Sequence, residues 1–236
     1  MAVSVVSATP DRRMVLTPIT PDAASRLARV EFAVAETGVG STGGLWLLMT
    51  TLFRHQPDRL GHAQRVARMA RAVAAHLGCQ EADVDAIERA ALAHEIGSIV
   101  VPDLEAGRPH EDAAVRARAA EQATTGATAI ARSPFLAPSA RLLRAMPEWI
   151  DGTGQPLGLA GDRIPMGARV LGVADVFDVM DSTCQQLGWP RDLAAVELVR
   201  YAGRRFDADV VAAALRVVET VPAERQAPLA GAPQVI

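Results

Sequence analysis

Apolar residues recur at helical spacing along most of the chain, and this periodicity restricts its fold more than any other feature. One apolar stripe of this kind is formed by Leu45, Leu48, Met49, Leu52 and Phe53. Residues 62–77 repeat the pattern, with arginines on the other faces. Further helices are predicted at residues 22–36, 81–96, 113–132, 139–146, 168–180, 190–202 and 207–219. No segment is predicted as a confident strand, since the β-branched stretch 99–101 is only three residues long, and we therefore expect an all-α protein.

Glycine and proline divide the chain into three parts. Residues 1–21 hold prolines and polar breakers and are predicted to be irregular, and the run from Gly38 to Gly44 resembles a linker. We therefore expect an N-terminal leader, helix and linker at residues 1–43, a helical domain at residues 44–220 and a frayed tail at residues 221–236. Within the domain, residues 151–166 are too rich in Gly and Pro to be regular.

Composition excludes several classes of protein. The chain has 236 residues, 50% of them hydrophobic and only 4% aromatic, which favours close helix packing. Its net charge is −3 and it contains no lysine, so broad nucleic-acid binding is not expected. Cys79 and Cys184 form no paired motif, and no apolar stretch is long enough for a membrane helix or signal peptide. A cytoplasmic protein with free thiols, and without contact with a membrane, is the expectation.

Four side chains on three predicted helices suggest a metal site: His62, His94, Glu95 and Asp175. Imidazole and carboxylate groups on facing helices of a bundle can converge on one divalent ion. Each residue also has a simpler explanation. A single histidine on a helix is more often a satisfied polar residue, and Asp175 would be equally satisfied by a buried ion pair with an arginine.

The order of motifs resembles the HD-GYP family of the HD phosphohydrolase superfamily over roughly residues 45–215. After His62 come the segments AALAHEIGSIVVPD, EWIDGTGQPLGLAGDRIP, ARVLGVADVFDVMDS and RRFDADVV. The most specific part runs from Ile150 to Ser182. This resemblance implies an HD-superfamily helical bundle. It also implies a centre of two or three iron or manganese ions that hydrolyses cyclic di-GMP in active members, with His94 and its neighbour Glu95 as catalytic residues.

The same resemblance shows where this chain departs from the family. Glu95 replaces the aspartate that follows the conserved histidine, and Ser98 replaces a lysine. Gln122, Met146 and Pro147 replace histidines, and Gln155 replaces the tyrosine of the Gly-Tyr-Pro signature. The surviving set, His62, His94, Glu95 and Asp175, matches the one-metal pattern of the wider superfamily. We therefore expect one divalent ion (iron, manganese or another metal) or none.

The Gly-rich loop offers candidate contacts to a phosphate or another ligand. Asp151, Gly152 and Gly154 either form scaffold or touch a ligand, and Arg163 and Arg169 suit phosphate but equally suit pairing with acids such as Asp162.

Three hypotheses follow. The first is a degenerate regulatory or binding module in bacterial cyclic-dinucleotide signalling, which binds a nucleotide, a phosphoester or a partner protein. The alternative is a metal-dependent phosphodiesterase with a single-metal site. The third is a structural helical protein that forms a homodimer through its N-terminal helices. Whether the chain is an enzyme stays open at this point.

Overall fold

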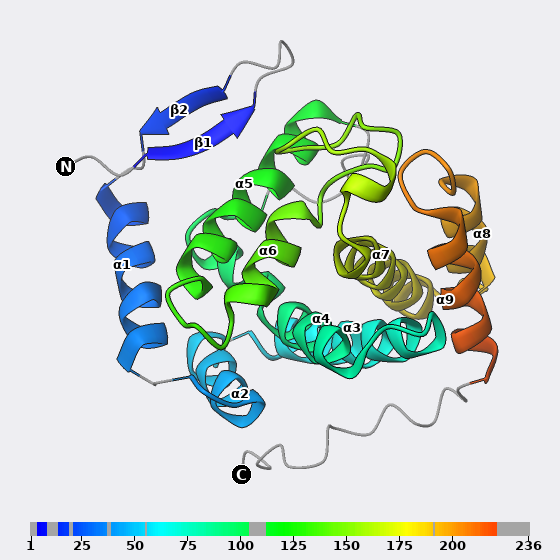
Figure 1. Cartoon of the computed structure of the whole chain (residues 1–236), viewed down its shortest axis with the longest axis horizontal. Coiled ribbons are helices and arrows are strands. Elements are labelled where there is room, and N and C mark those ends of the chain that lie inside the picture. The colour runs from blue at the N-terminus through cyan, green and yellow to red at the C-terminus, as the bar shows by residue number, and fades with distance from the viewer. Residues whose placement is uncertain are drawn as a thin grey trace.

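The computed structural model describes residues 4–8, 14–18, 21–36, 39–54, 56–103, 112–190 and 192–220. Within them the chain is a helical bundle, which confirms the all-α fold class (Figure 1). In the part that is described, no helix combines the length and the apolar character that crossing a bilayer requires.

The helices follow the predicted order with shifted ends. They are α1 (Pro21–Glu36), α2 (Thr42–Leu52), α3 (Pro57–His76), α4 (Glu81–Ala93), α5 (Ala113–Ile130), α6 (Ala137–Ala145), α7 (Met166–Leu187), α8 (Asp192–Arg200) and α9 (Ala208–Thr220). Two short 3-10 helices, η1 (His94–Ile99) and η2 (Gly161–Arg163), lie between α4 and α5 and between α6 and α7. Helix α3 begins at Pro57, so His62 lies inside this helix and does not open it.

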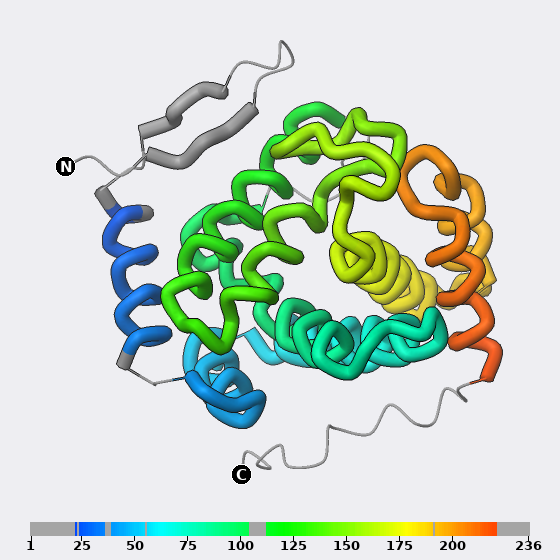
Figure 2. Tube along the Cα trace, in the orientation of Figure 1, coloured from blue at the N-terminus to red at the C-terminus, as the bar shows by residue number. Residues whose placement is uncertain are grey.

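The core of the bundle surrounds α7. Residues on several sides of this helix are buried, including Val170, Leu171 and Ala174, so other helices must cover it. Figure 2 shows α3 and α4 running side by side along one edge of the molecule, with α5 and α6 to one side of α7 and α8 and α9 to the other. The small side chains of Ala67 and Ala90 are fully buried, which lets the helices pack closely.

The N-terminal part is more regular than predicted, and its helix packs on the bundle. Part of the leader is regular, because β1 (Ser4–Ala8) and β2 (Met14–Pro18) form an antiparallel pair. The predicted linker is shorter than expected, since α2 already begins at Thr42 after the N-cap Ser41, whose hydroxyl accepts a hydrogen bond from the Gly44 amide. Val30 of α1 belongs to the same hydrophobic core as the helices that follow. The predicted tail, 221–236, lies outside the described residues.

Helix α4 ends three residues earlier than predicted, and η1 continues the chain in a tighter conformation. The cause is a close approach of α5. A Cβ atom on Gly97 would lie 2.0 Å from the backbone oxygen of Gln122, so only glycine fits between the two segments. This contact fixes η1, and with it His94 and Glu95, against α5.

Candidate metal centre

The structure brings the four predicted ligands together. The Nε2 atoms of His62 and His94 lie 3.1 Å apart. Oδ1 of Asp175 is 3.1 Å from the first of these atoms and 3.5 Å from the second. Oε1 of Glu95 completes the group at 3.9 Å from His62 Nε2 and 3.6 Å from His94 Nε2. Donor atoms bound at about 2.1 Å to a tetrahedral ion would be about 3.4 Å from one another. The two histidine nitrogens have about this spacing to each other and to each carboxylate, and His62, His94 and Glu95 form the group whose atoms all lie within 4.8 Å of one another.

Hydrogen bonds hold both imidazoles with Nε2 towards the centre. His94 Nδ1 donates to the backbone oxygen of Ala91 over 2.6 Å, and a carbonyl oxygen can only accept. His62 Nδ1 donates to Oδ2 of Asp178 over 2.7 Å. In the neutral imidazole the Nε2 lone pair is then free to bind a cation, which is the usual arrangement of metal-binding histidines. The two donor nitrogens therefore fit a metal by their orientation as well as by their spacing.

Asp178 has a second partner that fixes it. Arg65, on the same helix as His62, donates from Nε to Oδ1 over 2.7 Å and from Nη2 to Oδ2 over 2.9 Å. Neither Arg65 nor Asp178 was predicted from the sequence, although Asp178 follows Asp175 at a spacing of three and therefore lies on the same face of α7. The arginine near this part of the site thus pairs with Asp178 and leaves Asp175 to the histidines.

The charges in the centre are strongly coupled. Burial alone would lower the pKa of His62, but its hydrogen bonds with Asp175 and Asp178 outweigh burial and raise that pKa to about 10. Burial also opposes the charge of His94, whose pKa is nevertheless raised by Asp175 and Glu95. Burial would raise the pKa of Asp175, but the two histidines lower it below its usual range. The carboxylates thus strongly stabilise positive charge at the position between the two imidazoles.

Glu95 contacts the positively charged side chain of Arg59 as well as the two histidines. Its Oε1 atom faces the histidines, whereas Oε2 is bound by Nη1 of Arg59, from the first turn of α3. Arg59 also donates from Nη1 to Ser98 Oγ over 3.1 Å and from Nη2 to Asp103. The guanidinium therefore lies at the outer side of Glu95 and leaves the inner oxygen available to a metal.

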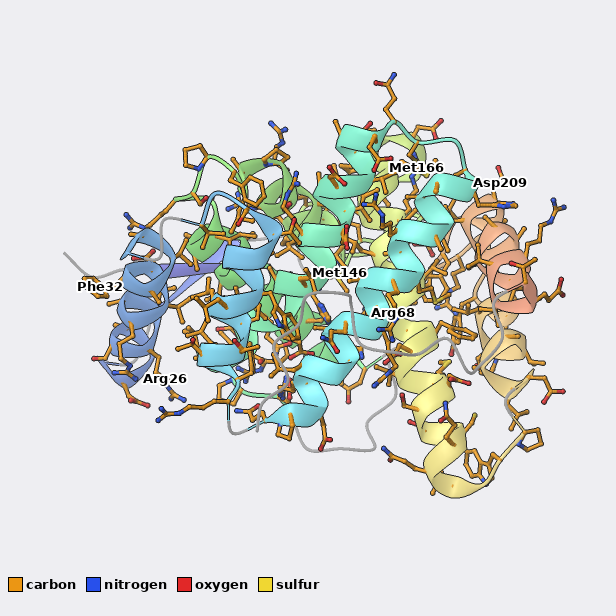
Figure 3. The ribbon with its side chains drawn as sticks, turned by 90° about the horizontal axis from the view of Figure 1, so that it is seen from below. Arg26, Phe32, Arg68, Met146, Met166 and Asp209 are labelled. Carbon is orange, nitrogen blue, oxygen red and sulfur yellow. The ribbon has the colours of Figure 1, made fainter. Side chains whose placement is uncertain are left out.

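A cavity of about 190 Å³ opens beside this centre, and His94, Glu95 and Asp175 form part of its wall. Besides Glu95, four positions at which the chain departs from the HD-GYP pattern line the same cavity: Ser98, Gln122, Met146 and Pro147. Met146 lies near the middle of the molecule in Figure 3. Gln155 is not among the lining residues. The replaced side chains thus lie beside the surviving ones, where they would meet the same ligand.

The Gly-rich loop makes scaffold contacts. Asp151 accepts hydrogen bonds from the amide and the hydroxyl of Thr153, and Gly152 has a φ of 83°. A Cβ atom on Gly154 would lie 2.1 Å from the Trp149 amide nitrogen. None of Asp151, Gly152, Gly154 and Arg163 lines the cavity, so the described contacts of this loop are those of a support.

One buried carboxylate holds this loop in place. Glu148 accepts hydrogen bonds from the amides of Leu157, over 2.5 Å, and Leu159, over 3.1 Å. Burial raises its pKa, although the amides that donate to it oppose that shift. Glu148 therefore connects the cavity wall to the turn that follows it.

The cavity wall also contains arginines, which could bind an anionic ligand. Arg169 is one of them, but its Nη1 donates to Asp207 over 2.6 Å and to Asp162 over 3.3 Å, so the guanidinium is occupied by acids. Arg116, which sequence analysis missed, lies over the Trp149 ring with its Cζ 5.1 Å from the ring centre. Its Nε is buried and has no hydrogen-bond partner within the described part of the chain. Arg116 is therefore the better placed of the two to meet an anionic ligand.

Comparison with known proteins identifies the family. A family model described as an HD domain matches residues 47–210. The cyclic di-GMP phosphodiesterase response regulator RpfG of Xanthomonas campestris is 34% identical over 157 residues, which cover 65% of this chain and 42% of that protein. The 3'3'-cGAMP-specific phosphodiesterase 3 of Vibrio cholerae is 32% identical over 171 residues, or 71% of this chain and 37% of that protein. The chain thus spans less than half the length of these two curated relatives.

Solved structures share the fold at lower sequence identity. A cyclic GMP-AMP specific phosphodiesterase of V. cholerae matches with a TM-score of 0.57 and 20% identity, over 75% of this chain and 49% of that one. An HDG"Y"P protein of Bdellovibrio bacteriovorus matches with a TM-score of 0.57 and 14% identity, over 93% and 95% of the two chains. The match of the family model over most of the chain shows that the chain belongs to the HD domain family, and these structures share its fold.

Proposed function

We propose that this chain is a metal-dependent phosphodiesterase that uses one divalent ion, held by His62, His94, Glu95 and Asp175. The observation that carries the proposal is the convergence of His62, His94 and Glu95, each with one ligand atom within 4.8 Å of the others. Asp175 Oδ1 lies 3.1 Å and 3.5 Å from the two histidine Nε2 atoms. Mixed imidazole and carboxylate ligands suit iron, manganese or zinc. Such an ion, when bound, acts as a Lewis acid towards a phosphoryl oxygen and lowers the pKa of a bound water.

The side chains of this protein would then orient the reaction. Asp178 and the Ala91 carbonyl fix the two imidazoles, so that the ligand set does not rearrange when charge develops on the substrate. Apolar Leu143 and Ile164 in the cavity wall limit the access of water around the reacting group. His94 and Glu95 touch the centre from η1, and their proposed role is to hold the ion beside the phosphoester.

Cyclic dinucleotides are the proposed substrate class, because the named relatives act on cyclic di-GMP and 3'3'-cGAMP. The cavity of about 190 Å³ is smaller than the roughly 300–1,000 Å³ of pockets that enclose a whole ligand. It would enclose one phosphodiester and the adjoining sugar, with the rest of the molecule outside. Arg116 would contact the ligand at a distance from the metal.

A binding module without hydrolysis is the second candidate. The observation in its favour is that Gln122, Met146 and Pro147 offer the cavity an amide and apolar groups in place of imidazoles. These groups cannot hold additional iron or manganese ions as histidines do. The same cavity would then bind a cyclic dinucleotide and report its presence to a partner protein.

One set of measurements separates the two candidates. Purified protein is analysed for metal content and then assayed with Mn²⁺, Fe²⁺ or Zn²⁺ for hydrolysis and for binding of cyclic di-GMP and 3'3'-cGAMP. Near-stoichiometric metal and hydrolysis that His94→Ala abolishes are expected, with His76→Ala, at the far end of α3, as the matched control. Tight binding without turnover under every metal would favour the module. If the protein binds neither a metal nor a cyclic dinucleotide, both candidates are contradicted.

A further inference from the structure

Arg59 occupies an unusual place beside the centre. It extends from the first turn of α3, and its guanidinium contacts two carboxylates that belong to other segments, Glu95 and Asp103. The side chain is only 29% exposed, although a lone arginine normally extends into solvent. An arginine guanidinium keeps its charge at all physiological pH values, and here it contacts the carboxylates of Glu95 and Asp103. A permanent positive charge is thus built in next to the metal ligands.

The contacts of Glu95 divide its carboxylate between two cations. Oε1 lies 3.6 Å from His94 Nε2 and faces the metal position, whereas Oε2 belongs to Arg59. A carboxylate that bridges two metal ions would use its oxygens in the same way, with one for each ion. Here the outer oxygen is already taken by a group with fixed charge.

Neighbouring side chains complete the outer position. Ser98 is short and accepts from Arg59 Nη1 over 3.1 Å, while it donates to the backbone oxygen of Glu95 over 2.8 Å. Asp103 binds Arg59 with one oxygen and accepts with the other from Gln122 Nε2 over 2.7 Å. Without Arg59, this position would present oxygens of Glu95, Asp103 and Ser98, and a divalent cation prefers oxygen ligands.

We propose that Arg59 is a positioning residue that takes the place of a second cation and thereby limits the centre to one metal ion. This inference rests on the single-metal centre of the proposed function. A second divalent ion would have to displace the guanidinium from the outer oxygens of Glu95 and Asp103 and would be repelled by its charge. The side chain of Glu95 is one methylene longer than the aspartate of the HD-GYP pattern, and this length fits the arrangement because the carboxylate reaches the histidines and Arg59 at the same time.

The test counts metal ions. Mn²⁺ is titrated into metal-free protein, and stoichiometry is measured by calorimetry and by electron paramagnetic resonance. Arg59→Met removes the charge and keeps an unbranched side chain of similar length, Arg59→Gln tests a polar neutral group, and Arg59→Lys keeps a positive charge. Arg71→Met is the matched control, because Arg71 lies on the same helix and is also paired with acids, but with Asp85 and Glu88 of α4. Thermal unfolding verifies that each variant is folded.

The expected result is one Mn²⁺ in the wild type, in Arg59→Lys and in Arg71→Met, and two in Arg59→Met or Arg59→Gln. Two ions bridged by Glu95 would also replace the spectrum of isolated Mn²⁺ with that of an exchange-coupled pair. A single ion in folded Arg59→Met and Arg59→Gln would overturn the role of Arg59 and leave the one-metal centre intact. A wild type that binds two ions would overturn both the inference and the single-metal proposal, as would a wild type that binds none.

Discussion

Asp178 holds His62 in the orientation that a metal ligand needs, because it accepts a hydrogen bond from His62 Nδ1 over 2.7 Å. The same carboxylate is bound at both oxygens by Arg65, so its position is fixed by a second group. The side chain of Asp178 is almost fully buried. The interaction between Asp178 and His62 thus extends the candidate centre beyond the residues that face the proposed metal position, and substitution of Asp178 tests the centre as directly as substitution of a proposed ligand.

Asp178→Asn is expected to weaken metal binding by about 10- to 100-fold, because an amide neither accepts as strongly from His62 Nδ1 nor balances Arg65. Titration with Mn²⁺ or Zn²⁺ measures the change in Kd. Asp162→Asn is the control, since Asp162 is fully exposed and lies away from the centre. An unchanged Kd in folded Asp178→Asn would show that His62 does not depend on this carboxylate for its orientation.

Metal affinity is expected to rise with pH. In the metal-free protein the pKa of His62 is raised to about 10 from its ordinary value of 6.5, so at neutral pH a metal must displace at least one proton. Kd should therefore fall by about tenfold for each unit of pH between roughly 6.5 and 8.5. Calorimetry in buffers of different ionisation enthalpy measures the released proton directly, and binding without proton release would contradict the assignment of His62 as a ligand.

The same shift predicts the opposite pH trend for the stability of the metal-free protein. Because the folded-state pKa of His62 is above the unfolded value of 6.5, its contribution is fully present below that pH. The contribution is lost as pH rises from there through about 10. Denaturation of chelator-treated protein should therefore show a free energy of unfolding that falls over this interval, and His62→Gln should flatten the trend.

The helical bundle was predictable because each helix carries its own signal. The apolar spacing around Val66 and Val73, and breakers such as Pro147, require no knowledge of the rest of the chain. The end of α4 was not predictable in this way. Apolar spacing continues through Ile96, and the helix changes at Ala93 because Gly97 lies against Gln122, a contact between residues distant in sequence.

The candidate site likewise contains residues that could be predicted from the sequence and residues that could not. Each of His62, His94, Glu95 and Asp175 stands in a motif, so sequence predicted them, and the structure brings them together. The partners that orient and neutralise them, such as Arg59, have no motif. Their roles depend on which side chains meet when helices pack, and that is set by the fold as a whole.

Gly97→Ala is expected to destabilise the protein by about 1–3 kcal/mol or more, because the added methyl group would lie 2.0 Å from the Gln122 oxygen. Separation of η1 from α5 should also weaken metal binding through His94. Gly43→Ala provides a control of opposite sign. Its Cβ would meet nothing closer than 3.9 Å, and alanine favours the helix over glycine by about 0.5–1 kcal/mol. Chemical denaturation measures both, and equal stability of the two variants would contradict the close approach of η1 to α5.

Arg116→Gln is expected to weaken the binding of cyclic di-GMP or 3'3'-cGAMP by about tenfold or more, which is the loss of a charge-assisted contact. Arg116 lines the cavity and is held over Trp149 by a hydrogen bond of 3.2 Å to the Thr153 carbonyl, so its guanidinium is in place before a ligand arrives. Metal stoichiometry should not change, because Arg116 contacts none of the metal ligands. Arg118→Gln is the control, since Arg118 pairs with Glu121 on the same helix and does not line the cavity. If both variants bind the nucleotide as the wild type does, the ligand does not reach this end of the cavity. If both lose affinity equally, the effect is one of net charge.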